Sequence, residues 1–518
     1  MHAVPRPPRA SRSLHSWRLF KALGLAAAGL ALAGLPGARP AEAPARHLET
    51  LDRGVVAVRT GAHAVFISWR LLGTDPGGIA FNVYRGATKL NAAPLTGATN
   101  FTDQAATREA YSVRPVLRGA EQPAPPASTP AWAQPYLRVP LQQPAGGTTV
   151  DGGAYTYTAN DASAADLDGD GQYELILKWD PTNSRDNGAA GVTGPVLLDA
   201  YRLDGTRLWR LDLGRNIRAG AHYTQFLAYD FDGDGRAELA CKTADGTVDG
   251  TGKTLGDARK DYRSLTTPTD APAVPSTRDP RYGRILAGPE YFTIFDGRTG
   301  AALATAPYVP TREPLDGWGG IGGNGGNDHY GNRCDRFVAA VAYLDGHLPS
   351  AVMCRGYYGR SVLAAWDWRG GQLTQRWVFD SQDAQNPYSG MGNHNLSVND
   401  VDQDGRDEIV YGAMVVDDNG QGLFTTGLRH GDALHVGNFD PHHARPRSLG
   451  RPRKRGARAR PPGRPRRGAL RRRHRPAAVE RRPGPRRGPR PGRRHRPSLP
   501  RGRAVGRLFG SGPALQQG

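Results

Sequence analysis

Cysteine is scarce in this chain. Only three occur among 518 residues, Cys241, Cys334 and Cys354, and no two of them are close in sequence. An odd number of cysteines without a CxxC pair excludes a disulfide-stapled scaffold and argues against a cysteine-based zinc or redox motif. We expect them to be small buried residues, with Cys241 and Cys354 in strands.

Long apolar runs are also missing. The longest, residues 22–35, is shorter than the ~20 residues that cross a bilayer. It follows a basic segment with five Arg and Lys residues and precedes a stretch of small residues. This order predicts a signal peptide over residues 1–43 that is cleaved near Ala38 or Ala43. We therefore expect a secreted protein, extracellular or periplasmic, without a membrane partner.

Acidic residues are nearly absent from one end of the chain. Residues 441–518 contain 26 Lys and Arg and one acid, whereas the other 440 residues contain 42 bases and 47 acids. The net charge of +20 therefore comes entirely from the last 78 residues. Because the remainder is mildly acidic, the whole-chain charge gives no reason to expect a nucleic-acid partner.

Residues 44–140 alternate apolar and polar side chains over short stretches separated by Gly, Pro and Asn. Such a pattern predicts strands joined by turns, and thus a small antiparallel sheet or sandwich. The strand-like segments are GVVAVRT, AVFISWRLL, IAFNVYRG and EAYSVRPVLRG.

Residues 141–440 contain a loose internal repeat. Each unit has an acidic loop, an apolar strand and usually a hairpin with a Gly-containing turn, and none shows helical periodicity. Repeated small β units of this kind predict a β-propeller, with a parallel β-helix as the weaker alternative. The acidic loops and their strands lie at residues 166–179, 230–243, 342–358 (a degenerate copy) and 400–414.

Three of these loops match D-x-D-x-D-G-x-x-E. Carboxylates at positions 1, 3, 5 and 9 converge on one point, and Gly at position 6 permits the sharp turn. Hard oxygen ligands in this number predict several structural Ca²⁺ ions rather than zinc or copper. The predicted ligands are Asp166, Asp168, Asp170 and Glu174; Asp230, Asp232, Asp234 and Glu238; and Asp400, Asp402, Asp404 and Glu408.

Two further constellations have more than one interpretation. His394, His430 and Asp432 could form a mixed nitrogen and oxygen metal site, or the histidines could be structural. Basic residues interleaved with Tyr and His could line a groove for an anionic sugar polymer, or form salt bridges between repeats. These polar stretches are residues 215–225, 241–247, 331–337 and 355–360.

With these motifs the chain resembles the secreted rhamnogalacturonan lyases of polysaccharide lyase family 11. The likeness runs from about Leu48 to Pro441. It is carried by LDRGVVAVRT, YTANDASAADLDGDGQYELILKWDPTNS, LDAYRLDGTRLWRLDLGRNIRAGAHYTQF, YLDGHLPSAVMCRGYY, GNHNLSVNDVDQDGRDEIVYGAMVVDDNG and HGDALHVGNFDP. The resemblance implies an N-terminal β-sheet domain followed by an eight-bladed, calcium-stabilised propeller, with His394, His430 and Asp432 as further calcium ligands.

The resemblance also implies calcium-dependent β-elimination in the rhamnose–galacturonate backbone of rhamnogalacturonan I, an anionic pectic polysaccharide. The candidates for the base are Lys242, His222, Arg218 and Arg355, and those for substrate binding are Asn160, Asp180 and Tyr357. We expect a monomer. The alternatives are a glycoside hydrolase and a non-catalytic calcium-stabilised propeller that binds carbohydrate or protein.

The chain departs from the family in two places. Residues 321–334 carry extra glycines, which indicates a loop insertion. Residues 441–518 consist mainly of Arg, Pro, Gly and Ala, a composition that predicts disorder. This tail could bind polyanions or tether the protein to a cell surface, but we favour a shifted reading frame. In that case C-terminal blades are missing, and we expect this chain to fold poorly and to be inactive.

Overall fold

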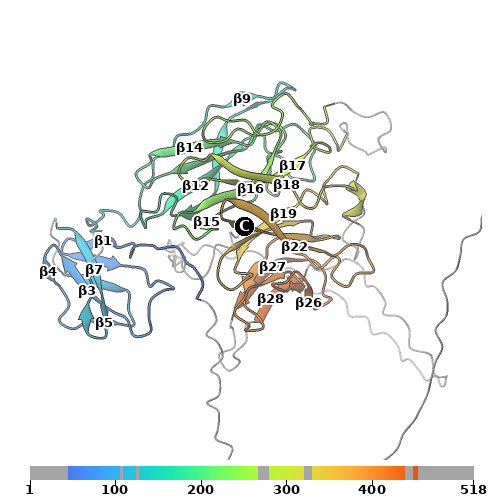
Figure 1. Ribbon diagram of the computed structural model, residues 1–518. Coiled ribbons are helices and arrows are strands. Elements are labelled where there is room, and N and C mark those ends of the chain that lie inside the picture. The colour runs from blue at the N-terminus through green and yellow to red at the C-terminus, as the bar shows by residue number, and fades with distance from the viewer. Residues whose placement is uncertain are drawn as a thin grey trace, which may run out of the picture. The chain divides into compact units, whose positions relative to one another are not determined.

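The computed structural model describes residues 45–104, 109–123, 128–265, 279–319 and 329–437, and the backbone of residues 447–452. The regular elements among these residues are all strands apart from one 3₁₀ turn at Leu315–Gly317, and turns and loops join them (Figure 1). The predicted all-β class is confirmed. No helix among the described residues has the length and apolarity that a membrane span requires. The predicted signal peptide at residues 1–43 lies outside the described residues.

The N-terminal part folds into two small antiparallel sheets, as the alternating pattern predicts. One has the order β1-β2-β6, and in the other β3 is paired with β4, β5 and β7, and β7 with β8. Trp69, Phe81 and Tyr111 are buried in their shared core. The strands are β1 (Val56–Gly61), β2 (Ala64–Ser68), β3 (Ala80–Arg85), β4 (Thr88–Lys89), β5 (Leu95–Thr96), β6 (Asn100–Asp103), β7 (Tyr111–Leu117) and β8 (Ala120–Glu121).

A short hairpin, β9 (Gly147–Thr148) and β10 (Ala154–Tyr155), leads into four antiparallel sheets of four strands, which we call repeat sheets 1–4. In each, the strands are hydrogen-bonded in chain order. Sheet 1 contains β11 (Tyr157–Ala165), β12 (Glu174–Pro181), β13 (Leu197–Tyr201) and β14 (Arg207–Asp212); sheet 2 contains β15 (Phe226–Tyr229), β16 (Glu238–Ala244), β17 (Glu290–Phe295) and β18 (Ala302–Pro307). Sheet 3 contains β19 (Phe337–Ala342), β20 (Ser350–Arg355), β21 (Val362–Arg369) and β22 (Gln372–Asp380); sheet 4 contains β23 (Ser397–Asn399), β24 (Glu408–Tyr411), β25 (Met414–Val416) and β26 (Gly422–Thr425).

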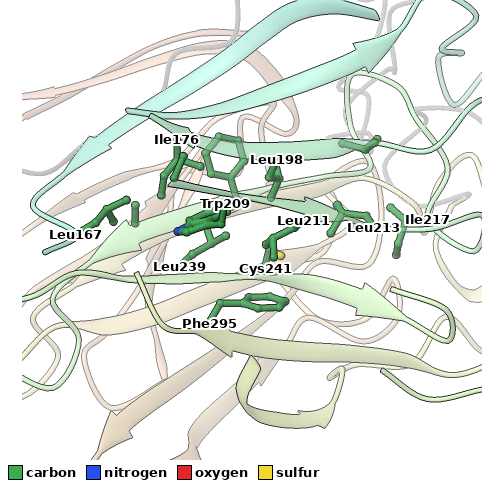
Figure 2. Packing of buried hydrophobic residues seen from close by; sticks show 14 of the residues in the cluster. Leu167, Ile176, Leu198, Trp209, Leu211, Leu213, Ile217, Leu239, Cys241 and Phe295 are labelled. Atoms are coloured by element: carbon green, nitrogen blue, oxygen red, sulfur yellow. The ribbon is translucent and has the colours of Figure 1, made fainter. Parts of the chain in front are cut away.

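The repeat sheets are stacked through their apolar faces. The first strands are neighbours in series, with β15 between β11 and β19, and β23 between β19 and β27 (Gly431–Gly437). Between sheets 1 and 2, Ile176, Leu198, Trp209, Leu239 and Phe295 form one buried cluster (Figure 2). The second strand of each sheet is buried along its length except at the half-buried Leu175, which explains the continuous apolar runs after the acidic loops.

The three cysteines are buried and free, as expected. Cys241 lies in β16 and Cys354 in β20, whereas Cys334 lies in the loop before β19. The carbonyl oxygen of Cys334 accepts a hydrogen bond from Arg355 Nε at 3.0 Å.

Six residues of the basic tail take part in strand pairing, and the disorder of the tail as a whole stays a prediction. β28 (Arg447–Pro452) is paired antiparallel with β27. Strand pairing uses backbone groups, so an open strand edge can be paired with a segment of almost any composition. The remainder of residues 441–518 and residues 321–328 of the predicted insertion at 321–334 lie outside the described residues.

Candidate functional site

Each acidic loop connects the first strand of a repeat sheet to the second. We call residues 166–174 loop 1, 230–238 loop 2, 343–348 loop 3 and 400–408 loop 4. In loop 1 the Asp166 carboxylate accepts hydrogen bonds from the amides of Gly169 and Gly171, both at 2.8 Å, and Glu174 accepts one from Leu167 at 2.9 Å. Gly171 has φ +84°, a conformation that only glycine adopts readily.

The same bonds recur in loops 2 and 4. Asp230 accepts from Gly233 and Gly235, Glu238 from Phe231, Asp400 from Gln403 and Gly405, and Glu408 from Val401. Carboxylate oxygens from positions 1, 3 and 5 lie within 4.8 Å of one another in all three loops. The structure therefore brings together the three predicted aspartates of each loop, whereas Glu174 and Glu238 are not grouped with them. In loop 4, Glu408 is grouped with Asp402 and with Asp417, which sequence reasoning missed.

Carboxylate oxygens without hydrogen-bond partners are a second feature of the loops that fits a bound cation. Glu408 is fully buried, and its Oε1 has no hydrogen-bond partner among the described residues; the same holds for Asp168 Oδ1. A buried carboxylate oxygen without a partner is costly, and a hard divalent cation would satisfy it. Burial, reinforced by the neighbouring aspartates, raises the pKa of Glu174 to about 7, of Glu408 to about 8 and of Glu238 to about 9.

Loop 3 is the degenerate copy that the sequence indicates. Tyr343 occupies the first position, and its hydroxyl lies 2.9 Å from that of Tyr229. Asp345 accepts hydrogen bonds from the amides of His347 and Leu348, at 2.7 and 2.8 Å. Among the described residues no carboxylate triple forms here.

The opposite ends of the sheets carry a different cluster. His394 Nε2 and His430 Nε2 lie 3.5 and 3.8 Å from Asp432 Oδ1. His430 Nδ1 lies 2.8 Å from the Gly392 carbonyl oxygen, so it carries the proton and directs the Nε2 lone pair toward Asp432. The predicted trio is thus assembled with one imidazole oriented as metal-binding histidines are, and its ligand role stays a prediction.

His222 lies beside this trio, with its ring centroid 5.9 Å from that of His394. Its Nε2 is 3.5 Å from Asp186 Oδ2, and its side chain is one-fifth exposed. Burial, together with the charge of Arg336, lowers the pKa of His222 to about 4. The imidazole is therefore neutral at neutral pH and can accept a proton.

Lys242 and Arg355 belong to a buried ion cluster between sheets 2 and 3. Lys242 Nζ lies 3.0 Å from Glu290 Oε1, and Arg355 contacts both Glu290 oxygens at 2.8 and 2.9 Å. Arg312 and Asp335 complete the cluster. Although burial opposes it, the surrounding cations hold the pKa of Glu290 well below its usual value. Neither Lys242 nor Arg355 faces an open surface, so the geometry favours salt bridges between repeats over a role as base.

Arg218 is also engaged in a structural role. Its guanidinium donates to the carbonyl oxygens of Asp186, Ala189 and Gly191 at 3.3, 2.7 and 3.1 Å, and to the Tyr223 hydroxyl at 2.5 Å. It holds the segment that carries Asp186, and thereby the partner of His222. The geometry counts against Arg218 as the base.

The three predicted substrate contacts differ in exposure. Asn160 is exposed in β11. Asp180 is buried at the end of β12, which raises its pKa, and its Oδ1 has no hydrogen-bond partner among the described residues. Tyr357 is fully buried and stacks on the His430 ring at 5.5 Å, so it supports the histidine cluster.

Sequence reasoning missed several members of this end. Arg336 donates to the Tyr357 hydroxyl at 3.0 Å, and the Tyr358 hydroxyl lies 3.3 Å from His394 Nε2. Lys178, almost fully buried, pairs with Asp161 at 2.5 Å. The polar stretches at residues 331–337 and 355–360 contained a signal for Arg336 and Tyr358, but no local pattern distinguished them from Arg355.

Two family models match the chain. The rhamnogalacturonan I lyases beta-sheet domain covers residues 46–132, and the C-terminal domain of rhamnogalacturonan lyase family 11 covers residues 136–448. The second match ends at residue 448, beyond Pro441, where we expected the family resemblance to end.

Characterised relatives and solved structures agree with these matches. The rhamnogalacturonan endolyase YesW and exolyase YesX of Bacillus subtilis (strain 168) are each 54% identical, over 403 and 398 residues, or 77% and 76% of this chain. The chain spans 61% of the length of each. The crystal structure of YesX matches with a TM-score of 0.71 and 53% identity, over 79% of this chain and 63% of that one. The family 11 lyase structure from Bacillus licheniformis matches with a TM-score of 0.71 and 56% identity, over 79% and 66%.

Proposed function

The chain belongs to rhamnogalacturonan lyase family 11, and on that premise we propose that it cleaves the rhamnose–galacturonate backbone of rhamnogalacturonan I by β-elimination. The observation that carries the proposal is the 54% identity to an endolyase and an exolyase over more than three-quarters of the chain. The substrate is then an anionic polysaccharide. The predicted signal peptide supports export, and we propose action as a monomer outside the cytoplasm, without nucleic-acid or membrane partners.

We further propose that the repeat sheets are blades of a calcium-stabilised β-propeller. The meander order of each sheet and the serial contacts of the first strands support this architecture. β27, which lies next to β23, would begin a fifth blade. Calcium ions would bind in loops 1, 2 and 4, where the carboxylates converge.

The chemistry would take place at the histidine end. A cation held by His394, His430 and Asp432 would neutralise the uronate carboxylate and so acidify the C5 proton. His222 is the base that the geometry favours, because it is neutral and partly exposed and its Nε2 faces Asp186. Asp186 orients its ring, Arg218 holds the segment of Asp186, and Arg336 adds positive charge where an anionic substrate would approach.

Incubation with rhamnogalacturonan I tests the reaction. A lyase releases products with an unsaturated, ultraviolet-absorbing end, a hydrolase yields new reducing ends without that absorbance, and a binding propeller releases no product. With the reading frame beyond residue 440 restored, we expect the first result, and its loss in His222→Gln but not in His435→Gln, a control at an exposed histidine of β27. The present chain, which lacks the C-terminal blades in our interpretation, should be inactive. Either of the other results contradicts the proposal. Product sizes distinguish internal from terminal cleavage.

A further inference from the structure

Residues 45–52, which precede β1 and which we call the N-terminal strap, cross the acidic loops of all four repeat sheets. At the first end, Arg46 forms a bidentate ion pair with Asp407 of loop 4, at 2.8 and 3.1 Å. At the other end, the Asp52 amide donates to the Gly171 carbonyl oxygen of loop 1 at 2.9 Å. The strap therefore runs through the repeats in reverse order.

The middle of the strap is bound to loops 3 and 2. The His47 amide donates to the His347 carbonyl oxygen at 2.8 Å, and the Tyr343 hydroxyl donates to the His47 carbonyl oxygen at 2.7 Å. His47 Nε2 lies 3.7 Å from Asp230 Oδ2 of loop 2. The imidazole is so close to this loop that a Cβ added to Gly233 would lie 3.2 Å from it.

Arg70 of the N-terminal sheets reinforces the far end of the strap. It lies 3.3 Å from the Asp52 carbonyl oxygen, and its guanidinium stacks at 4.5 Å on the ring of Tyr173 in loop 1. The strap thus contacts every loop, loops 2 and 4 through side chains and loops 1 and 3 through backbone groups. A linker without a structural role would not need this density of specific bonds.

One strap residue opposes this docking. Glu49 is partly buried, and its Oε1 has no hydrogen-bond partner among the described residues. The Glu49 carboxylate accepts a hydrogen bond from the Asp166 amide and interacts with the charges of Asp166 and Asp230. The strap therefore brings a further carboxylate to the first positions of loops 1 and 2, where cations would offset the repulsion.

We propose that the N-terminal strap is a cation-dependent latch, which closes across the four repeat sheets when loops 1 and 2 hold divalent ions and is released when the ions are removed. This inference rests on the calcium sites of the proposed function. It assigns to residues outside the acidic loops a coupling between cation binding and the joining of distant repeats.

Hydrogen exchange followed by mass spectrometry tests the latch on the full chain, during a titration from saturating Ca²⁺ to excess chelator. We expect the amides of His47 and Asp52 to exchange at least about tenfold faster after chelation, and to lose protection at a higher Ca²⁺ concentration than the amides of β12. Glu49→Gln should keep the strap protected to lower Ca²⁺, whereas Glu313→Gln, at an exposed glutamate, should match the unaltered chain.

A second variant examines the strap with Ca²⁺ present. Arg46→Gln removes the pair with Asp407 and should speed exchange at His47 even at saturating Ca²⁺; Arg259→Gln, in an exposed pair with Asp257, should not. The latch is overturned if the strap and β12 lose protection at the same Ca²⁺ concentration, or if the exchange profile of Glu49→Gln equals that of the unaltered chain. If Ca²⁺ binding is still measured in that case, the proposed calcium sites stand without the latch. Absence of bound Ca²⁺ in elemental analysis overturns both.

Discussion

At one end of the repeat sheets the connections are acidic and rich in glycine, whereas at the other end imidazole, tyrosine and guanidinium groups gather. The same strands connect these two ends of the repeat sheets. Loop 1 is complete within nine consecutive residues, and its carboxylates are held by its own amides. The histidine end draws His222, Tyr358, His394 and His430 from segments that are far apart in sequence. A local motif can therefore be copied from sheet to sheet, but a site assembled from several sheets forms only once the sheets are stacked.

Removal of divalent cations should have the largest effect on the thermal stability of the protein. Each site filled well above its Kd contributes ~3–4 kcal/mol, and several sites act together. We expect chelation to lower Tm by more than about 10 °C. Calorimetry with and without chelator measures this, with Mg²⁺ addition as a control for ionic strength. An unchanged Tm would contradict cation binding at the acidic end.

The histidine end should respond in rate rather than in stability. His222→Gln removes the proposed base, which typically contributes ~10²–10⁴-fold, from a side chain that is only partly buried. The rate of unsaturated product formation should fall by that factor while Tm changes little. Equal activity in this variant would exclude His222 as the base.

The ion cluster between sheets 2 and 3 should be sensitive to loss of its central anion. Glu290→Gln leaves Lys242, Arg312 and Arg355 buried without their shared partner. Removing one member of a buried ion group costs ~3–5 kcal/mol. Urea unfolding should show this loss, and Glu313→Gln should leave the midpoint unchanged. A neutral result would show that the three cations have other anionic partners.

The pH dependence of stability should distinguish the ion-free from the ion-loaded acidic end. Without cations, the folded chain keeps Glu174, Glu408 and Glu238 protonated up to about pH 7, 8 and 9, while the unfolded chain releases these protons near pH 4.5. Their contribution is thus fully present below about pH 4.5 and is lost as pH rises through 7 to 9. Unfolding in chelator should show stability falling across this range, and Ca²⁺ should abolish the fall.

The smallest expected effect is that of an aspartate substitution in loop 3, which should not change calcium binding as the same substitution in loop 2 does. Asp345→Asn keeps an oxygen that can accept from the amides of His347 and Leu348, so the free energy of unfolding should change by no more than ~1 kcal/mol. The matched change Asp232→Asn removes a predicted ligand of loop 2. Calcium stoichiometry should fall by one ion in Asp232→Asn and stay constant in Asp345→Asn.

Much of this fold is predictable because its signals are local. The alternation in residues 44–140 predicts the small sheets, and each apolar run after an acidic loop becomes a buried second strand. The candidate site is less predictable. Glu290 is 48 residues from Lys242 and 65 from Arg355, so nothing near either base indicates its partner. The strap is likewise invisible, because Arg46 and Asp407 are 361 residues apart.

The buried thiols give the stacked sheets built-in reporters. Cys241 lies in the core shared by sheets 1 and 2, and Cys354 in the core shared by sheets 3 and 4. A maleimide reagent can reach them only when these interfaces separate, and burial raises the pKa of Cys241 to about 12, which keeps the thiol unreactive in the closed state. Labelling rates at the two positions would therefore time the opening of each half of the stack independently, without any introduced probe.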